Sequence, residues 1–253
     1  MAKRFTDKSV VITGGGGGLG QTSAIMFARE GAHLILLDIN AAGLEETAKL
    51  IEAEGASCST HTVDLSQEEN INQLAEELCK QYPSIDVLYN NAGAAYGEVN
   101  LMIDQMDQEK WLRYLSINSL SPLFVAKALR SSLSNAKGVV INQTSMASYQ
   151  PANVYGTTKA MLNSLTFGMA NVFSQDNIRV VAIAPGIMET PASKGSLPKE
   201  TYDRVQGMQL SNLHGTAEDI ANLALFLASD EARFINCEII ACDAGNRLRG
   251  WRG

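Results

Sequence analysis

Five consecutive glycines occupy positions 14–18 and separate two segments that read as regular structure. Residues 9–13 are mostly β-branched and apolar, which is typical of a buried strand. Residues 22–28 have the apolar spacing of a helix that packs one face inward. A flexible linker would instead lie between domains and be rich in serine and other polar residues. The glycines are therefore interpreted as a strand-to-helix turn whose backbone comes close to another group.

The rest of the chain alternates between two kinds of segment. Apolar, β-branched runs predict strands at residues 10–12, 33–37, 59–63, 87–89, 139–141, 179–183 and 238–241. Helical spacing predicts helices at residues 43–54, 70–81, 108–132, 155–175 and 217–228. Capping boxes are predicted to open two of these helices, at residues 66–69 and 216–219. The alternation predicts an α/β fold, a doubly wound parallel sheet of about seven strands with helices on both faces.

No linker or repeat interrupts this pattern, so residues 1–253 are expected to form a single domain. Residues 190–212 are the one long irregular interruption, and a loop of that length is predicted to be a substrate lid. The C-terminal tail, residues 246–253, carries a short basic cluster around Trp251.

Composition excludes several classes of partner. The net charge is −7, from 20 basic and 27 acidic residues, which argues against binding to a nucleic-acid backbone. No apolar run is long enough to span a membrane and no signal peptide is visible, so no membrane partner is expected. The four cysteines lack metal-site spacing, and we expect no metal and no disulfide framework. They are interpreted as ordinary residues of a reducing cytoplasm: Cys58, Cys79, Cys237 and Cys242.

The glycine turn has the composition of a phosphate cradle. Without a Cβ, glycine lets main-chain N–H groups approach a pyrophosphate, which the positive end of the helix dipole also favours. Gly15, Gly17 and Gly20 fit the pattern G-x-G-x-x-G, whereas Gly14, Gly18 and Gly20 fit T-G-x-x-x-G-x-G. The run itself does not choose between these two registers.

Asp38 ends the second predicted strand about 20 residues beyond the glycines, where a carboxylate accepts hydrogen bonds from ribose hydroxyls. The alternative is an ordinary solvated acid at a strand end. Its neighbours Ile39 and Asn40, and Gly17 in the turn, supply no cation for a 2′-phosphate. Because a carboxylate repels a phosphate, the sequence favours NAD over NADP as cofactor.

Four further motifs follow in order along the chain and resemble those of the short-chain dehydrogenase/reductase family. With the glycine turn read as Thr13-Gly14-x-x-x-Gly18-x-Gly20, they are Asp64-Leu65, Asn90-Asn91-Ala92-Gly93, Tyr155-x-x-x-Lys159 and Pro185-Gly186-Ile187-Met188-Glu189-Thr190. The resemblance covers essentially the whole chain and implies a Rossmann-type oxidoreductase domain. It implies that Thr190 contacts the nicotinamide carboxamide. The implied cofactor-binding residues are Gly14, Gly17, Gly18, Leu19, Gly20, Asp38, Ile39, Asp64, Leu65, Asn91, Ala92, Gly93, Tyr155, Lys159, Pro185, Gly186, Met188 and Thr190.

Tyr155 and Lys159 are four residues apart near the start of a predicted helix, so both side chains lie on one face, one turn apart. A phenol with an ordinary pKa near 10 is a poor acid–base catalyst at neutral pH, and a nearby ammonium group favours its phenolate. A Tyr155 of lowered pKa could exchange a proton with a carbonyl or alcohol oxygen while hydride moves to or from nicotinamide. Without the other motifs, the pair could equally be a surface tyrosine beside a solvated lysine with no role in catalysis.

The resemblance adds two catalytic residues, Ser145 and Asn118. Ser145 is implied to hydrogen-bond the substrate oxygen, and Asn118 to hold a water that links Lys159 to solvent. Ser145 precedes Tyr155 by ten residues, about three fewer than the family commonly shows, and we place the deletion within residues 146–154. Thr144 remains a lesser candidate for the role of the serine. Cys237, where many relatives have glycine, is a second departure.

The expected activity is oxidoreduction between NAD(H) and a secondary alcohol or ketone. The substrate pocket is expected to be mostly apolar, which favours a medium-sized hydrophobic or cyclic substrate. Lys194 and Lys199 on the lid leave room for an anionic group, although solvated lid charges are the simpler reading. The expected pocket residues are Ala94, Ala95, Tyr96, Met146, Tyr149, Gln150, Ile187 and Met188.

Two alternatives stay open. Residues 217–221 and 243–245 resemble those of 3-oxoacyl thioester reductases, which mostly use NADPH and carry basic residues where this chain has Gly17 and Ile39. A non-catalytic dinucleotide-binding sensor is the other alternative, and an intact catalytic set argues against it. The resemblance also implies a homotetramer joined through residues 108–132, 155–175 and 238–241. Trp251 is predicted either to fray with the tail or to pack across a subunit interface near a neighbouring active site.

Overall fold

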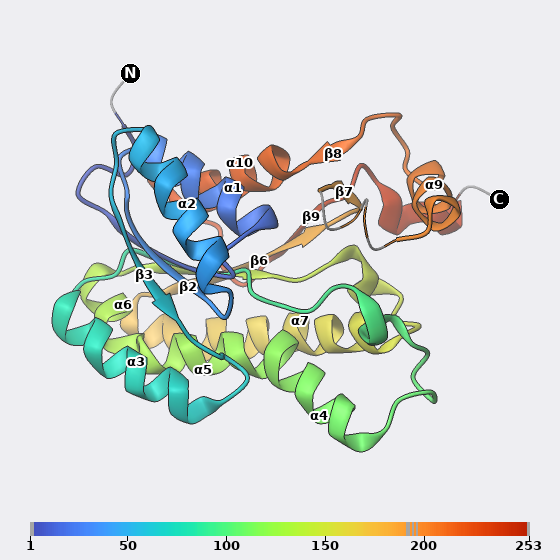
Figure 1. The fold of residues 1–253 in the computed structure, drawn as a ribbon, viewed down its shortest axis with the longest axis horizontal. Coiled ribbons are helices and arrows are strands. Elements are labelled where there is room, and N and C mark those ends of the chain that lie inside the picture. Colours follow the sequence, from blue (N-terminus) through green and yellow to red (C-terminus); the bar gives the residue numbers. More distant parts are fainter. Residues whose placement is uncertain (1–2, 191–192, 194, 196, 252–253) are drawn as a thin grey trace.

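The computed structural model describes residues 3–190, 193, 195 and 197–251, with side chains described up to residue 248. Seven parallel strands form the central sheet in the order β3-β2-β1-β4-β5-β6-β9, so the strand order reverses between β1 and β4 (Figure 1). This confirms the predicted fold class. The strands are β1 (Ser9–Thr13), β2 (His33–Asp38), β3 (Cys58–Thr62), β4 (Val87–Asn90), β5 (Val139–Gln143), β6 (Arg179–Pro185) and β9 (Ile239–Cys242).

Helices cover both faces of the sheet because successive strand residues point to opposite sides. In β1, Val10 and Ile12 pack in one hydrophobic cluster and Val11 in the other. The helices over the first cluster are α1 (Gly18–Arg29), α2 (Ala41–Ala53) and α10 (Ala217–Ala228). The helices over the second are α3 (Glu68–Gln81), α5 (Ser121–Ala128), α6 (Arg130–Ala136) and α7 (Val154–Phe173).

The helix predicted at residues 108–132 is broken. It begins as α4 (Gln108–Leu115), passes through a π-helical turn, η2 (Ser116–Leu120), and continues as α5 and α6. Pro122 lies in the first turn of α5 and has no N–H for the carbonyl four residues earlier, which is that of Asn118. The prediction of a single long helix was therefore wrong. The break leaves the backbone carbonyl of Asn118 without its usual α-helical donor.

One of the two predicted capping boxes is present. Thr216 and Asp219 exchange the expected bonds at the start of α10. The box predicted at residues 66–69 was wrong, because α3 begins at Glu68 and the Ser66 N–H donates to Asp64 Oδ1 instead.

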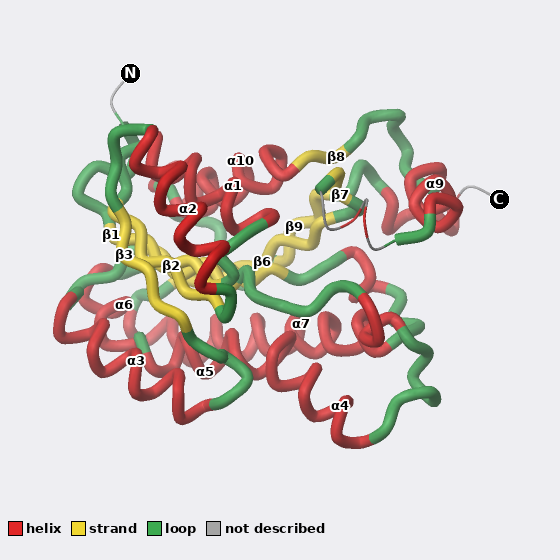
Figure 2. The backbone as a smooth tube through the Cα atoms, viewed as in Figure 1, coloured by secondary structure: helices red, strands yellow, loops and turns green. Residues whose placement is uncertain are grey.

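The segment predicted as an irregular lid contains a helix, α9 (Lys199–Gly207), which follows Pro198. Figure 2 shows loops and short helices clustered between the sheet and α9. Two short strands, β7 (Met188–Glu189) and β8 (Gly215–Thr216), pair at the base of this segment. The remaining short helices are η1 (Gly97–Asn100), η3 (Met146–Tyr149), η4 (Ser174–Asp176), η5 (Asp230–Ala232) and η6 (Asn246–Trp251). A search of the described helices finds none with the length and apolarity to cross a membrane.

Candidate active site

A cavity of about 1060 Å³ lies at the carboxyl ends of the strands. Parallel strands end at the same edge of a sheet, and ligands of doubly wound proteins bind there, beside the point where strand order reverses. The residues that follow the strands supply much of the wall, and α9 and η6 close the far side. The lining residues at or directly after the strand ends include Gly14, Asp38, Asn91, Thr144 and Gly186.

The glycine turn resolves the choice of register. Gly14 and Gly18 have φ angles of +70° and +54°, which L side chains rarely adopt. A Cβ on Gly20 would lie 2.0 Å from the Gly14 carbonyl oxygen. Gly17, by contrast, is extended and has no heavy atom within 4 Å of a Cβ built on it. Gly20 belongs to both registers, so the positive φ angles at Gly14 and Gly18, against the unconstrained Gly17, favour the register Gly14, Gly18 and Gly20.

Asp38 is oriented by the same turn. Its two carboxylate oxygens accept the Gly16 N–H at 2.8 Å and the Asn40 N–H at 2.9 Å, and the carboxylate lines the cavity. Each oxygen keeps a further lone pair, which suits acceptance from ribose hydroxyls. Ile39 beside it is 68% exposed and brings no charge. A glycine turn open at Gly17 beside a fixed carboxylate fits the adenosine and pyrophosphate parts of a nicotinamide dinucleotide.

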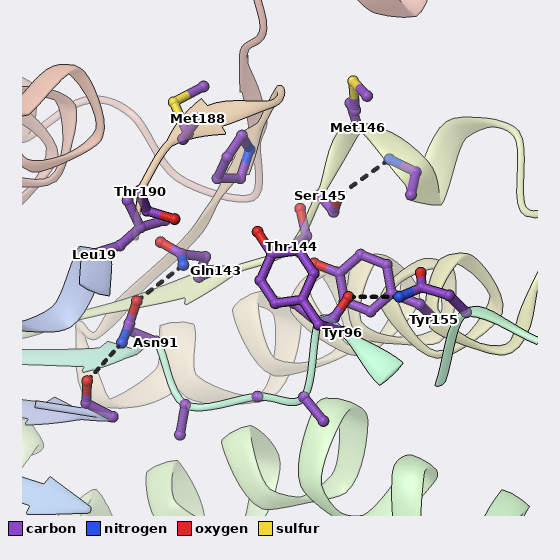
Figure 3. A pocket seen from close by; sticks show the side chains of 18 of the residues that line it. Leu19, Asn91, Tyr96, Gln143, Thr144, Ser145, Met146, Tyr155, Met188 and Thr190 are labelled. Atoms are coloured by element: carbon purple, nitrogen blue, oxygen red, sulfur yellow. Dashed lines mark hydrogen bonds between the residues drawn. The ribbon is translucent and has the colours of Figure 1, made fainter. Parts of the chain in front are cut away.

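Asn91 joins the ends of β1 and β4. Its Nδ2 donates to the carbonyls of Thr13 and Gly14 at 3.0 and 3.1 Å, and its Oδ1 accepts from Gln143 Nε2 at 2.9 Å (Figure 3). Gln143 also accepts a hydrogen bond from the buried Tyr89 hydroxyl. This connection fixes the floor of the cavity. The sequence analysis missed Gln143. Its position as the last residue of a buried strand could have indicated that it lies at the site.

Ser145, Tyr155 and Lys159 lie together at the end of β5 and the start of α7. Asn153 caps α7 by accepting the Gly156 N–H at 2.8 Å, which sets the first turn that carries Tyr155. The Ser145 hydroxyl accepts the Ala147 N–H at 3.2 Å and lies close enough to Tyr155 to lower the pKa of its phenol, and both residues line the cavity. Lys159 is 3% exposed. Its Nζ donates to the Gln143 carbonyl at 2.8 Å and lies 6.0 Å from the centre of the Tyr155 ring.

The electrostatics differ from the expectation of a lowered phenol pKa. Burial raises the pKa of Tyr155 to about 12, and the neighbouring Ser145 hydroxyl opposes this only in part. Burial also lowers the pKa of Lys159 to about 8. The expectation was wrong for the ligand-free protein, because the ammonium group is satisfied by a backbone carbonyl and desolvation outweighs its attraction for a phenolate.

Asn118 is fully buried and braces two segments. Its Oδ1 accepts the Ala94 N–H at 2.8 Å, and its Nδ2 donates to the Ala94 carbonyl and to Thr158 Oγ1. A Cβ on Gly93 would approach both Asn118 Oδ1, at 2.9 Å, and Lys159 Nζ, at 3.2 Å. Asn118 and Lys159 are thus neighbours across Gly93, and the side chain of Asn118 is already committed to protein partners.

Thr144, the lesser candidate for the role of Ser145, is held elsewhere. Its hydroxyl donates to the Ile183 carbonyl on β6 at 3.1 Å. Behind Ser145, the Ser148 hydroxyl donates to the Ser145 carbonyl at 2.6 Å and accepts from Asn163 Nδ2 at 2.8 Å. Ser148 and Asn163 were missed by the sequence analysis, because only the fold of the shortened loop brings them to Ser145.

Thr190 stands at the base of the lid beside Tyr96. The Thr190 and Ser193 side chains each accept the other's backbone N–H, at 3.0 and 3.1 Å. Burial raises the pKa of Tyr96, and the neighbouring side chains of Thr190 and Ser193 oppose this rise. Figure 3 shows Tyr96 and Tyr155 in the same part of the cavity.

The expected substrate residues all line the cavity, and so do most of the expected cofactor residues. The exceptions among the cofactor and catalytic residues lie behind its wall: Gly18, Gly20, Asn118 and Lys159. Lys199 pairs with Asp203 at 2.5 Å on the exposed side of α9, and Lys194 lies outside the described residues. The lid and tail add lining residues that the sequence analysis missed: Leu197, Thr201, Arg204, Val205, Met208, Asn246 and Arg247.

The fold and this site define a class of protein, the oxidoreductases that act on alcohol or ketone groups with a nicotinamide dinucleotide. A family model described as enoyl-(acyl carrier protein) reductase matches residues 15–247. The chain belongs to the short-chain dehydrogenase/reductase family.

Relatives of this family are similar over nearly the whole chain. Dehydrogenase/reductase SDR family member 6 of Rattus norvegicus is 32% identical over 252 residues, covering 96% of this chain and 98% of the relative. An NAD-dependent glycerol dehydrogenase of Listeria innocua is 30% identical over 251 residues, covering 97% and 96%. The structure of a 7α-hydroxysteroid dehydrogenase complexed with NADH and 7-oxo glycochenodeoxycholic acid superposes with a TM-score of 0.89 at 29% identity, covering 96% of each chain.

Proposed function

We propose that this protein is an NAD(H)-dependent oxidoreductase that interconverts a secondary alcohol and a ketone. The observation that carries the proposal is that Ser145 and Tyr155 lie next to each other on the cavity wall, with Lys159 buried one helical turn away. A bound nicotinamide supplies or accepts the hydride. The glycine turn, Asp38 and the segment Asn91–Gly93 would hold the dinucleotide.

The chain's own groups handle the proton. Tyr155 is protonated at neutral pH and donates from its hydroxyl to a ketone oxygen, which Ser145 orients by a second hydrogen bond. In the opposite direction the same phenol oxygen takes the alcohol proton, which requires the pKa of Tyr155 to fall when the complex forms. Lys159 is the buried amine on the same helix face that would favour this fall.

Tyr155→Phe tests the mechanism. Removing the hydroxyl should lower kcat with a secondary alcohol by at least about 100-fold, because general acid–base catalysis contributes about that much. NADH binding, measured by fluorescence titration, should stay within about twofold, since the ring remains. Tyr82→Phe is the matched control, because Tyr82 lies outside the cavity lining. Unchanged turnover in Tyr155→Phe would remove the mechanism.

The preference for NAD over NADP rests on Asp38. Its carboxylate faces the turn, and the residues beside it, Ile39 and Asn40, are uncharged. A 2′-phosphate would meet this carboxylate without a compensating cation. Faster turnover with NADP than with NAD would contradict the assignment.

A medium-sized hydrophobic or cyclic substrate suits the wall formed by Ala95, Met146, Ile187 and Met208. The similarity to a hydroxysteroid dehydrogenase supports this size and character. A 3-oxoacyl thioester reductase is the second candidate, favoured by the resemblance of residues 217–221 and 243–245 to those enzymes. Assays with a 3-oxoacyl thioester and NADPH, beside secondary alcohols and NAD, separate the two. A dinucleotide-binding sensor would bind NADH and turn over neither.

We also propose a homotetramer. Apolar side chains are exposed on α4 and α7, including Leu112 at 55% and Phe167 at 45%, and Phe234 before β9 is 96% exposed. Their burial against other copies would remove this apolar surface from water. Light scattering of the full chain should give the mass of four subunits, and a monomer would contradict the proposal. The side chain of Trp251, for which an interface role was predicted, lies outside the described residues.

A further inference from the structure

Two arginines, Arg204 and Arg247, line the cavity where the lid helix meets the C-terminal segment. Arg204 is on α9 and Arg247 on η6, which lie together at one end of the molecule (Figure 1). The two segments are tied by neighbouring residues, since Asn246 Nδ2 donates to the Val205 carbonyl at 2.6 Å. A second bond joins the Leu210 N–H to the Ala244 carbonyl at 2.9 Å. Both arginines are therefore brought to the same part of the cavity wall.

Neither guanidinium group forms an ion pair with any residue that the structure describes. Asp203, next to Arg204, and Asp243, close to Arg247, bind other groups. Asp203 pairs with Lys199, and Asp243 accepts the backbone N–H groups of Gly245 and Arg247. The charge of both arginines is thus left for another partner.

The charges of the cavity are segregated. The acids among its described lining residues are Asp38 and Asp64, which follow β2 and β3 at the proposed adenosine end. At the other end, the Arg247 guanidinium lies 5.5 Å from the centre of the Tyr149 ring, a contact that orients it beside the substrate wall. Arg113 on α4 also lines the cavity, and an anion is favoured at the end that holds Arg204 and Arg247, away from Asp38 and Asp64.

We propose that the substrate is a hydroxy or keto acid whose carboxylate binds Arg204 and Arg247. This inference rests on the proposed oxidoreductase function and names its substrate class. A guanidinium group presents a planar fork of donors that matches a carboxylate, and such charge-assisted bonds are about twice as strong as neutral ones. Apolar residues such as Ile187 and Met146 line the same cavity, so the carboxylate is separated from the reacting carbon by an apolar body.

The test compares acids with their neutral carboxamides. 4-Hydroxycyclohexanecarboxylate and 9-hydroxydecanoate are assayed with NAD, each beside its amide and beside a phosphate ester of the same alcohol body. The acid of at least one pair should have a kcat/KM about 100-fold above its amide. Arg204→Gln and Arg247→Gln should each reduce this preference by about tenfold or more through KM, leaving the amide within about twofold. Lys199→Gln removes a charge from the same helix outside the cavity lining, and it should keep the preference.

Equal turnover of acids and amides would overturn this inference and leave the proposed function standing. A preference for the phosphate ester over the acid would overturn the assignment to carboxylates. Arginine variants that raise the KM for NAD but not for the acid would overturn it too, because the guanidinium groups would then serve the cofactor. No turnover of any alcohol with NAD would overturn the proposed function, and the substrate class with it.

Discussion

Replacement of Gly20 by alanine should damage the cofactor turn more than any neighbouring glycine change. The new Cβ would lie 2.0 Å from the Gly14 carbonyl oxygen and 2.5 Å from Asn91 Nδ2. Contacts of this kind begin only near 3.0 Å, so the turn must open by about 1 Å. Opening weakens the 3.1 Å bond from Asn91 to that carbonyl. Overpacking costs about 1–3 kcal/mol and a lost hydrogen bond about 1 kcal/mol, so the free energy of unfolding should fall by about 2–4 kcal/mol.

The assay is urea or thermal unfolding of the ligand-free protein, with NADH titration alongside. For a chain of this size the melting temperature should fall by roughly 5–10 °C in Gly20→Ala. Gly18→Ala should cost about 1–2 kcal/mol, because φ is +54° but no atom lies within 4 Å of the Cβ. Gly17→Ala is the matched control and should change stability by less than about 0.5 kcal/mol. If Gly17→Ala proves as destabilising as Gly20→Ala, the register Gly14, Gly18, Gly20 is refuted.

Three other changes probe the site. Burial lowers the pKa of Lys159 to about 8, so between about pH 8 and 10.5 the unfolded chain binds more protons and stability rises with pH. In urea unfolding, the stability of wild type should gain about 2 kcal/mol relative to that of Lys159→Met from about pH 7.5 to 9.5. Parallel pH profiles of the two proteins would contradict this. Asp38→Ala combined with Ile39→Arg should move the kcat/KM ratio toward NADP by at least about tenfold, and an unmoved ratio would count against the charge argument. Ser148→Ala removes the donor to the Ser145 carbonyl and should lower kcat by about tenfold with the Kd of NADH unchanged, whereas an equal loss of NADH binding would indicate general damage.

The sheet was predictable because its inner strands, β2, β1, β4, β5 and β6, are almost wholly buried and most of them read as short apolar runs. Predicted and observed strand bounds agree within a residue or two, as for residues 179–183 against Arg179–Pro185. Helix α9 was missed for the opposite reason. It has no buried residue among those described in it, so it shows no apolar periodicity. The π-helical turn depends on Pro122, a local signal that the sequence analysis did not use.

The site could be predicted only as far as local motifs reach. Residues directly after strands gather because parallel strands end at one edge, and this explains why Asp38 and Asn91 line one cavity. The pKa of Tyr155 depends on how completely the tertiary structure excludes water, which the spacing to Lys159 does not encode. The segments that carry Arg204 and Arg247 are about 40 residues apart and are joined by contacts such as the bond from Asn246 to Val205, which no motif signals.

The loop predicted to be shortened between Ser145 and Tyr155 supplies only part of the support of these two residues, because β5 and α7 supply the rest. Ser145 follows β5, and the preceding Thr144 is fixed to β6 by a backbone bond of 2.8 Å to Ile183. Tyr155 belongs to α7, which is held against β5 from its own helix face: Lys159 donates to the Gln143 carbonyl, and Asn142 Nδ2 donates to Thr166 Oγ1 at 3.0 Å. These contacts of the strand and the helix lie outside the loop, and Ser148 and Asn153 of the loop add to them. A change in the length of this loop would alter the wall built by η3, where Met146 and Tyr149 line the cavity and Tyr149 meets Arg247. Loop length should therefore act mainly on which substrate fits, because most of the contacts that hold the proton-transfer pair come from the strand and the helix.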